Sequence, residues 1–423
     1  MFGYLATFGF FPNVYGLLSI SLPIYILLVT KNSNEEVVIF SSYLAGAEVF
    51  IRMTNGFILY ETGKYAIIIF LFLGILIGEF KQRFSIQYIY YILLLLLGII
   101  FTQVPEGESL RKSILFNLSG PILLGIAALY FYQRPIDKEK LLDSLFFMLL
   151  PLFSMVSYLY FRTPDLKEIV FGGEANFATS GGFGPNQVVT AIGLGIFIIT
   201  VFILIKKKLT GYLFLDYIFL IYFVYRGLLT FSRGGIFTVT GALLVFSLFY
   251  LIHRRVSIGV FLKYILTAGF FILAIWIYTS DITGGMLNNR YTGKNAAGVQ
   301  KDITTGRSDI LVIQFENFLE NPLGIGVGNG KYERQNKIEN VTATSHNEVG
   351  RLLEEHGIIG LILLTILLTV PLFNFFRSSN YQRAFIISFY IFWFLTINHS
   401  AMRIALPGFI YGLSLIRIIE NEE

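Results

Sequence analysis

Residues 303–360, ITTGRSDILVIQFENFLENPLGIGVGNGKYERQNKIENVTATSHNEVGRLLEEHGIIG, are the stretch around which the rest of the chain is organised. They make up most of a polar interval, residues 280–356, whereas the sequence on either side is apolar almost throughout. Asn321-Pro322 and the glycines of Leu323–Gly330 interrupt the stretch, because proline and repeated glycines oppose regular structure. The sequence therefore predicts a polar loop region between two groups of apolar segments.

Two short helices are predicted inside this loop region. The first follows Thr304-Thr305-Gly306 and stops at the Asn-Pro pair. The second begins at Ser345, with Glu348 at the spacing of a capping box, and ends near His356-Gly357. In this interpretation His346 is the first helical residue, where unpaired N–H groups and the helix dipole disfavour imidazolium. The glycine-rich loop between the two helices is predicted to fold back over the membrane surface.

The composition indicates a membrane protein. Hydrophobic residues make up 55% of the 423 residues and charged residues only 14%, whereas soluble domains contain about 25% charged residues. Apolar runs of roughly 18–22 residues match one bilayer thickness, so we expect an all-α polytopic membrane protein. The absence of cysteine excludes disulfides, cysteine–zinc sites and thiol nucleophiles. The net charge of +5, without a basic block, gives no indication of a nucleic-acid partner.

About twelve or thirteen membrane helices are expected. The predicted spans are 10–30, 37–58, 65–79, 86–102, 113–132, 141–160, 186–205, 212–230, 234–252, 259–279, 357–376, 384–399 and 404–418. Residues 1–279 would then form about ten spans, residues 280–356 an extracytoplasmic loop domain containing the short helices, and residues 357–423 about three spans with a short cytoplasmic tail.

The orientation follows from the basic residues, which gather on alternate loops and so predict that these loops are cytoplasmic. They are Lys81, Arg83, Arg134, Lys138, Lys140, Lys206, Lys207, Lys208, Arg254, Arg255, Arg377, Arg383 and Arg417. The interval 280–356, the loop 161–185 and the turn Ser232–Gly235 would then face outward.

Basic residues are enriched on the cytoplasmic side, but four arginines lie on the outward side: Arg52, Arg226, Arg233 and Arg307. One interpretation is that they extend to lipid headgroups, with Glu48 and Arg52 forming a local i,i+4 pair. The other is an anion site near the outer leaflet, because guanidinium binds phosphate oxygens bidentately. Arg226 and Arg233 would point the same way if one helix contained both, since seven residues are nearly two turns.

Three segments resemble the O-antigen ligase and O-antigen polymerase superfamily of bacterial surface-polysaccharide assembly. They are Thr230-Phe-Ser-Arg-Gly-Gly235; Thr305-Gly-Arg-Ser308 followed by a helix and Asn321-Pro-Leu-Gly-Ile-Gly-Val-Gly328; and His346-Asn347 with Leu352-Leu353, Glu355 and Gly357 leading into a span. Gly184-Pro-Asn-Gln187 is a weaker feature of the same kind. The resemblance covers roughly residues 175–400. Position 356, commonly apolar in the family, is His here, and Glu348 replaces a small or polar residue.

The resemblance implies a GT-C-like glycosyltransferase that acts outside the bacterial cytoplasmic membrane. Such an enzyme moves a glycan from a polyprenyl diphosphate carrier to the hydroxyl of a glycan or lipid-linked acceptor. His346 matches the family's histidine and would act as base, and Arg233 and Arg307 match its arginines and would hold the diphosphate. Arg226, Arg52, Asn347, Glu355 and Asn186 are further candidate substrate-binding residues. No cofactor or metal is expected, and membrane lipids and other polysaccharide-assembly proteins are candidate partners.

The residues leave several alternatives open. His356 and His399 are interpreted as structural or interfacial, and His253 as part of a cytoplasmic charge cluster. A transporter or flippase of an anionic lipid-linked glycan is the competing function. A transporter usually carries ionisable groups at mid-membrane and shows related halves, whereas here the charges lie at the outer surface. Polymerase and ligase share a donor and differ in acceptor, so the sequence does not separate them.

Overall fold

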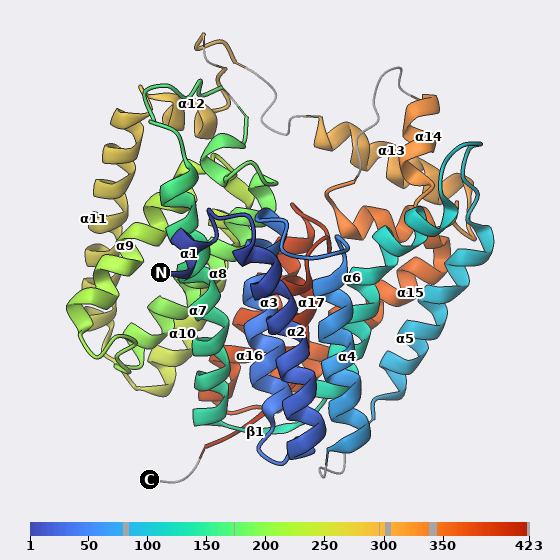
Figure 1. Cartoon of the computed structure of the whole chain (residues 1–423), viewed down its shortest axis with the longest axis horizontal. Coiled ribbons are helices and arrows are strands. Elements are labelled where there is room, and N and C mark those ends of the chain that lie inside the picture. Colours follow the sequence, from blue (N-terminus) through green and yellow to red (C-terminus); the bar gives the residue numbers. More distant parts are fainter. Residues whose placement is uncertain (79–83, 173, 296, 301–305, 338–344, 421–423) are drawn as a thin grey trace.

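The computed structural model describes residues 1–78, 84–172, 174–295, 297–300, 306–337 and 345–420. In these ranges the regular secondary structure is almost all helical, as expected, and the helices stand side by side with the short loop helices at one end (Figure 1). The predicted features at Lys81, Arg83, Thr304 and Thr305 lie outside the described residues.

The first group of elements precedes the polar interval. It consists of α1 (Phe2–Leu5), α2 (Phe11–Thr30), α3 (Glu36–Met53), α4 (Thr62–Ile77), α5 (Ile86–Leu97), η1 (Gly98–Phe101), α6 (Leu110–Phe131), β1 (Pro135–Asp137), α7 (Lys138–Arg162), η2 (Ala178–Ser180), α8 (Pro185–Leu204), α9 (Leu213–Leu229), α10 (Arg233–His253) and α11 (Ile258–Ile282). The second group comprises α12 (Met286–Thr292), α13 (Arg307–Glu320), α14 (Gly330–Lys337), α15 (Glu348–Phe376), α16 (Asn380–Ile397), α17 (Ala405–Leu413) and β2 (Arg417–Ile419).

A helix lies at every predicted span, but the helices differ in length. Among the described residues, six helices are long and apolar enough to cross a membrane: α2, α6, α7, α8, α10 and α15. A seventh is obtained if α11 and α12, which meet at a 113° bend, count as one span. The expected twelve or thirteen spans therefore require shorter or more charged helices to cross as well. The segment 404–418 is not one continuous helix, since α17 ends at Leu413 and covers only about 14 Å.

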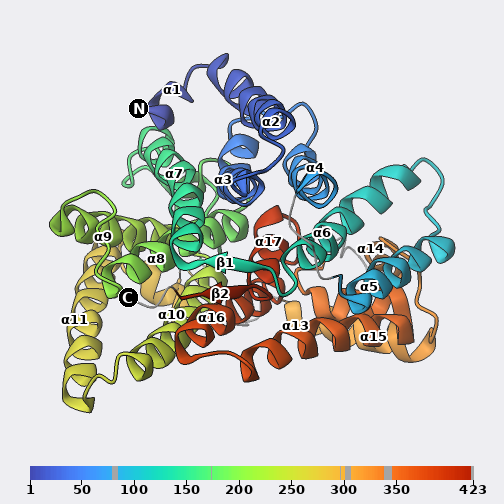
Figure 2. The ribbon, with the colours of Figure 1, turned by 90° about the horizontal axis from the view of Figure 1, so that it is seen from below.

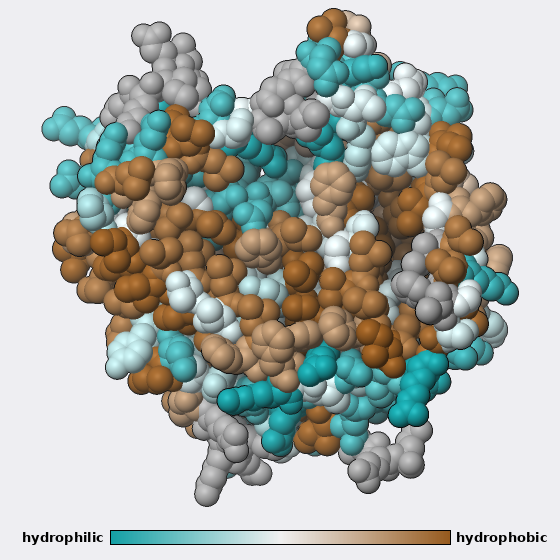
Figure 3. All heavy atoms as spheres, turned by 180° about the vertical axis from the view of Figure 1, so that it is seen from behind, coloured by the Kyte–Doolittle hydropathy of each residue, from teal (hydrophilic) through white to brown (hydrophobic). Residues whose placement is uncertain are grey.

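The surface is divided into an apolar belt and two polar ends (Figure 3). Several of the predicted cytoplasmic basic residues meet at one end. Arg134 and Arg417 are brought together by the parallel pairing of β1 with β2, and Lys207 forms an ion pair with Glu139 at 2.6 Å. Lys138 lies over the ring of Tyr381. The helices α12, α13 and α14 lie at the opposite end (Figure 1).

Within the polar interval, the first predicted loop helix is found as α13, ending at Glu320 just before the Asn-Pro pair. The helices α12 and α14 were not predicted. The start of α15 differs from the prediction, because its N-cap is Asn347, whose side chain accepts from the N–H of Gly350 at 2.8 Å. Ser345 instead donates to the carbonyl of Asn347, so the predicted capping box is wrong. His346 precedes the helix rather than opening it.

The glycine loop packs against a break in α15. Gly357 has φ 58° and ψ −132°, which interrupts the helix where the second loop helix was expected to end. The break leaves the carbonyls of Glu354 and Glu355 without helical partners. They accept instead from the N–H groups of Ile325 and Gly326, both at 3.1 Å. Gly324, Gly326 and Gly328 all have positive φ, and a Cβ at Gly324 would lie 2.3 Å from the carbonyl oxygen of Glu355.

The centre of the molecule is formed by α17, which is buried along its whole length. It packs against α6, α16 and α3 (Figure 2). The connection between α16 and α17, residues 398–404, therefore runs at the base of the polar end, next to the residues that precede α15. We call it the α16–α17 connection.

Candidate functional site

The segment that carries His346 is held by the α16–α17 connection. The N–H of Ala401 donates to the carbonyl of His346 at 3.0 Å. Arg403 donates from its guanidinium to the carbonyl of Ser345 at 2.7 Å, and the side chain of Asn347 donates to that of Asn398 at 2.8 Å. Three hydrogen bonds to three successive residues fix this short non-helical segment in place.

The α16–α17 connection is in turn held by α3. Arg52 donates to the carbonyl of Arg403 at 2.9 Å and to Glu48 at 3.0 Å. The other oxygen of Glu48 accepts from the N–H of Ala405 at 2.5 Å. The Arg52 guanidinium also lies 3.6 Å from the ring centroid of Tyr60. Glu48 and Arg52 thus form the local pair considered from the sequence, and this pair also anchors a segment more than 350 positions away in the chain.

His346 lies in an electropositive, poorly solvated place. Its Nδ1 atom is buried and has no hydrogen-bond partner among the described residues. Burial, the positive charges of Arg403 and Arg307, and His399 lower the pKa of His346 to about 4. The sequence also predicted a lowered pKa for His346, but from a helix N-terminus rather than from burial and neighbouring cations. A histidine with this pKa is neutral near pH 7 and has a ring nitrogen that can accept a proton.

Three arginines from different helices form what we call the arginine cluster: Arg233, Arg290 and Arg307. Arg233, the first residue of α10, donates to the carbonyl of Arg290 on α12 at 3.3 Å. Burial and the positive charges of Arg233 and Arg307 lower the pKa of Arg290 to about 10. Burial and Arg233 also lower the pKa of Arg307, the first residue of α13. Such a concentration of positive charge favours binding of an anion.

The structure separates the two arginines that a continuous helix would have aligned. The helix α9 ends at Leu229 and α10 begins at Arg233, so Arg226 and Arg233 lie on different helices. Arg226 is buried and donates to the hydroxyl of Thr163 at 2.8 Å and to the carbonyl of Thr179 at 3.1 Å. These bonds join α9 to the loop between α7 and α8.

Asn186 and His399 lie beside the turn that precedes α10. Asn186 accepts from the hydroxyl of Ser232 at 2.6 Å. His399 is bonded through Nδ1 to the carbonyl of Leu395 at 3.0 Å, and its Nε2 lies 3.3 Å from the hydroxyl of Thr190. A Cβ at Gly234 would lie 2.4 Å from the His399 ring. Glycine at that position therefore lets the α16–α17 connection approach the Ser-Arg-Gly turn closely.

Glu355 belongs to a set of buried ion pairs on α15 and its neighbours, which we call the α15 ion pairs. Arg351 bonds to Glu348 and, at 2.6 Å, to Glu355. The second oxygen of Glu355 accepts from the N–H of Gly328 at 2.9 Å. Glu354 accepts from the side chains of Gln314, Asn317 and Arg334, at 3.0, 2.8 and 2.8 Å.

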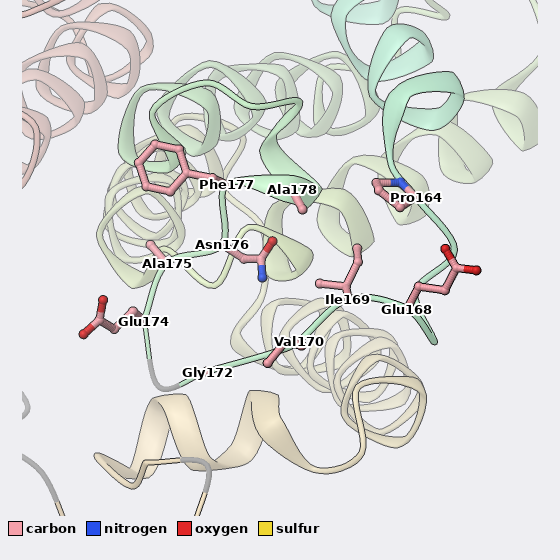
Figure 4. A pocket seen from close by; sticks show the side chains of 10 residues that line it. All are labelled: Pro164, Glu168, Ile169, Val170, Gly172, Glu174, Ala175, Asn176, Phe177 and Ala178. Carbon is pink, nitrogen blue, oxygen red and sulfur yellow. The ribbon is translucent and has the colours of Figure 1, made fainter.

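Two cavities open near these groups. One, of about 580 Å³, is lined by ten residues between Pro164 and Ala178, and Figure 4 shows Glu168 and Glu174 at opposite sides of it. None of the ten residues shown there is a site residue predicted from the sequence. The other, of about 320 Å³, lies between the start of α6, α14, α15 and the α16–α17 connection, and it includes Ser345 and Glu355.

The structure thus brings His346 and Arg307 together with Arg233, and it places Arg290, His399 and Arg403 beside them. Sequence reasoning missed Arg290 and Arg403 and interpreted His399 as structural or interfacial. One signal was available for Arg403, because it lies between two predicted spans on the outward side, as Arg233 does. Nothing local distinguishes Arg290, whose position depends on the packing of α12 against α10.

The comparisons with known proteins agree with the sequence motifs. Residues 218–365 match the family model described as O-antigen ligase. The matched segment includes Arg226, Arg233, Arg307 and His346, and it excludes Asn186 and Arg403. Neither the curated proteins nor the solved structures contain a match to the chain.

Proposed function

We propose that this member of the O-antigen ligase and polymerase superfamily transfers a glycan from a polyprenyl diphosphate carrier to an acceptor hydroxyl. The observation that carries the proposal is His346 beside Arg307 of the arginine cluster: its buried Nδ1 has no hydrogen-bond partner among the described residues, and its pKa is lowered to about 4. A proton acceptor and a phosphate-binding group next to each other are what such a transfer requires.

The donor is held by its diphosphate. Arg233 and Arg307 bind the phosphate oxygens and stabilise the charge that develops as the bond between the anomeric carbon and the carrier phosphate breaks. The electron pair of that bond leaves with the carrier diphosphate. Burial of Arg307 supports this role, because an anion is bound more strongly in a poorly solvated place.

The acceptor is activated by His346. Its neutral ring takes the proton of the acceptor hydroxyl while the oxygen forms the new bond to the anomeric carbon. The hydrogen bonds from Ala401, Arg403 and Asn347 hold the backbone of this segment so that the ring stays in one place. We include no metal or cofactor in the proposal, and the choice between polymerase and ligase depends on the acceptor.

The test is transfer by purified protein in liposomes that contain a polyprenyl-diphosphate glycan and an acceptor. His346→Ala should lower the rate of glycosidic product formation by about 10²–10⁴-fold, as expected for a lost general base. His253→Ala, at the opposite end of the molecule and in ring contact with Tyr381, is the matched control and should retain full activity. Donor binding should survive in both variants.

Two outcomes would contradict the proposal. Product formation by His346→Ala at the wild-type rate would show that His346 has no catalytic role. Donor movement across the bilayer by the wild type, without product, would favour a transporter.

We also propose that the site faces outward in the bacterial cytoplasmic membrane. A membrane-impermeant thiol reagent applied to spheroplasts should then label Gln335→Cys and not Lys207→Cys, and the reverse pattern would overturn this orientation.

A further inference from the structure

The 320 Å³ cavity lies directly beside the segment that contains His346. It is lined by Ser345, the residue before His346, and by Arg403, which bonds to the Ser345 carbonyl. The remaining lining comes mainly from the first two turns of α6 and from α14. Its volume lies at the lower end of the range of about 300–1,000 Å³ that is typical of small-molecule sites. A ligand in it would be adjacent to the proposed base.

The cations that line this cavity differ in whether a carboxylate neutralises them. Arg351 is paired with Glu355, and Lys331 lies 3.8 Å from Glu108. Lys112 and Arg403 line the same cavity and form no ion pair within the described part of the chain. The cavity therefore offers two positive charges, one from the start of α6 and one from the α16–α17 connection, to an anionic ligand.

Two aromatic residues complete the lining. Phe116 lies 5.4 Å from the Arg403 guanidinium, and Tyr332 has a buried hydroxyl without a hydrogen-bond partner in the described ranges. Aromatic rings offer an apolar body for packing, and a buried hydroxyl without a partner leaves hydrogen-bonding capacity unused. Rings, hydroxyl partners and cations together suit a sugar ring that carries an acidic group.

We propose that this cavity binds an acidic sugar of the acceptor glycan, one that bears a carboxylate or a phosphate. This inference rests on the proposed function, because it assigns the acceptor side of the same reaction. The sugar's acidic group would lie between Lys112 and Arg403, and its ring against Phe116. The acceptor hydroxyl to be glycosylated would then extend past Ser345 toward His346.

The test uses the reconstituted full-length protein and two acceptor oligosaccharides, one that contains glucuronic acid and one with glucose in its place. Lys112→Glu should raise KM for the acidic acceptor roughly tenfold, the effect of losing about one charge-assisted contact. It should leave KM for the neutral acceptor and the KM for donor unchanged. Arg111→Glu changes the neighbouring exposed residue, which does not line the cavity, and should behave as the wild type.

A binding measurement separates this inference from the proposed function. Titration of the acidic oligosaccharide into protein in nanodiscs, without donor, should show binding that Lys112→Glu weakens and Arg111→Glu does not. Equal binding of the acidic and neutral oligosaccharides, or equal weakening by both variants, would overturn the cavity assignment even if transfer occurs. Binding with the expected pattern but no transfer would instead overturn the proposed chemistry. If inorganic diphosphate binds, the acidic oligosaccharide does not, and Lys112→Glu weakens the diphosphate binding, the cavity belongs to the carrier and the proposal is contradicted.

Discussion

The arginines of the α15 ion pairs and those around His346 lie in one small region, but they face different partners. Arg351 and Arg334 each meet buried carboxylates at 2.6–2.8 Å. Arg307 and Arg403 meet no carboxylate at ion-pair distance within the described residues, and both lower the pKa of His346. The same residue type thus stabilises the fold in one place and leaves positive charge available for a ligand in the other.

The difference follows from the cost of burying charge. A buried arginine that bonds to a carboxylate is neutralised, so removal of either partner leaves an uncompensated charge. A half-buried arginine without a carboxylate keeps its positive electrostatic potential, which then acts on any charged group that enters the site. We therefore expect substitutions in the α15 ion pairs to affect stability first, and substitutions around His346 to affect activity first.

The largest expected effect is on stability at Glu354, which accepts hydrogen bonds from α13 and α14 and is fully buried. Glu354→Ala should lower the free energy of unfolding by about 3–5 kcal/mol, because the Arg334 guanidinium would lose its buried partner. The measurement is thermal unfolding of the detergent-solubilised protein. Glu316→Ala, an exposed carboxylate on α13, is the matched control and should leave the melting temperature unchanged. A similar melting temperature for both variants would show that the α15 ion pairs do not stabilise the fold as proposed.

The next effect is on activity at the arginine cluster. Arg307→Lys and Arg233→Lys keep the charge but lose the bidentate geometry. Each should slow transfer by about 30- to 1,000-fold, which corresponds to a loss of about 2–4 kcal/mol in the transition state. For Arg307→Lys the melting temperature should stay that of the wild type, in contrast to Glu354→Ala. If both lysine variants transfer glycan at the wild-type rate, the arginines bind lipid headgroups instead and the anion site lies elsewhere.

The smallest effect is on the pH dependence of the reaction. His346 acts as base in its neutral form, and its pKa of about 4 means that kcat/KM should stay high as pH falls through 6.5 and decline only near the lowered pKa. Arg403→Gln removes a positive charge, stabilises imidazolium and should move this decline to higher pH. Arg403→Lys keeps the charge and serves as the control. A decline at the same pH in both variants would show that Arg403 does not act on the base.

Much of the fold could be predicted from the sequence, because the signals are local. The apolar runs located the membrane helices, and Pro322 and Gly357 located a helix end and a helix break. These features depend on backbone chemistry and on periodicity, which the neighbouring residues alone determine. The same local motifs indicated Arg233, Arg307 and His346, and they indicated the family that the comparison supports.

The environment of each charged side chain depended on tertiary structure. The sequence showed Glu48 and Arg52 four residues apart, but only packing of α3 against α17 brings that pair to the connection that holds His346. Arg226 and Arg233 look equivalent in the sequence, and only the turn between α9 and α10 separates them. Whether an arginine is neutralised or left facing a site is set by residues from other helices. Spacing along a chain does not specify which helices meet, so that part of the site was decided by the fold.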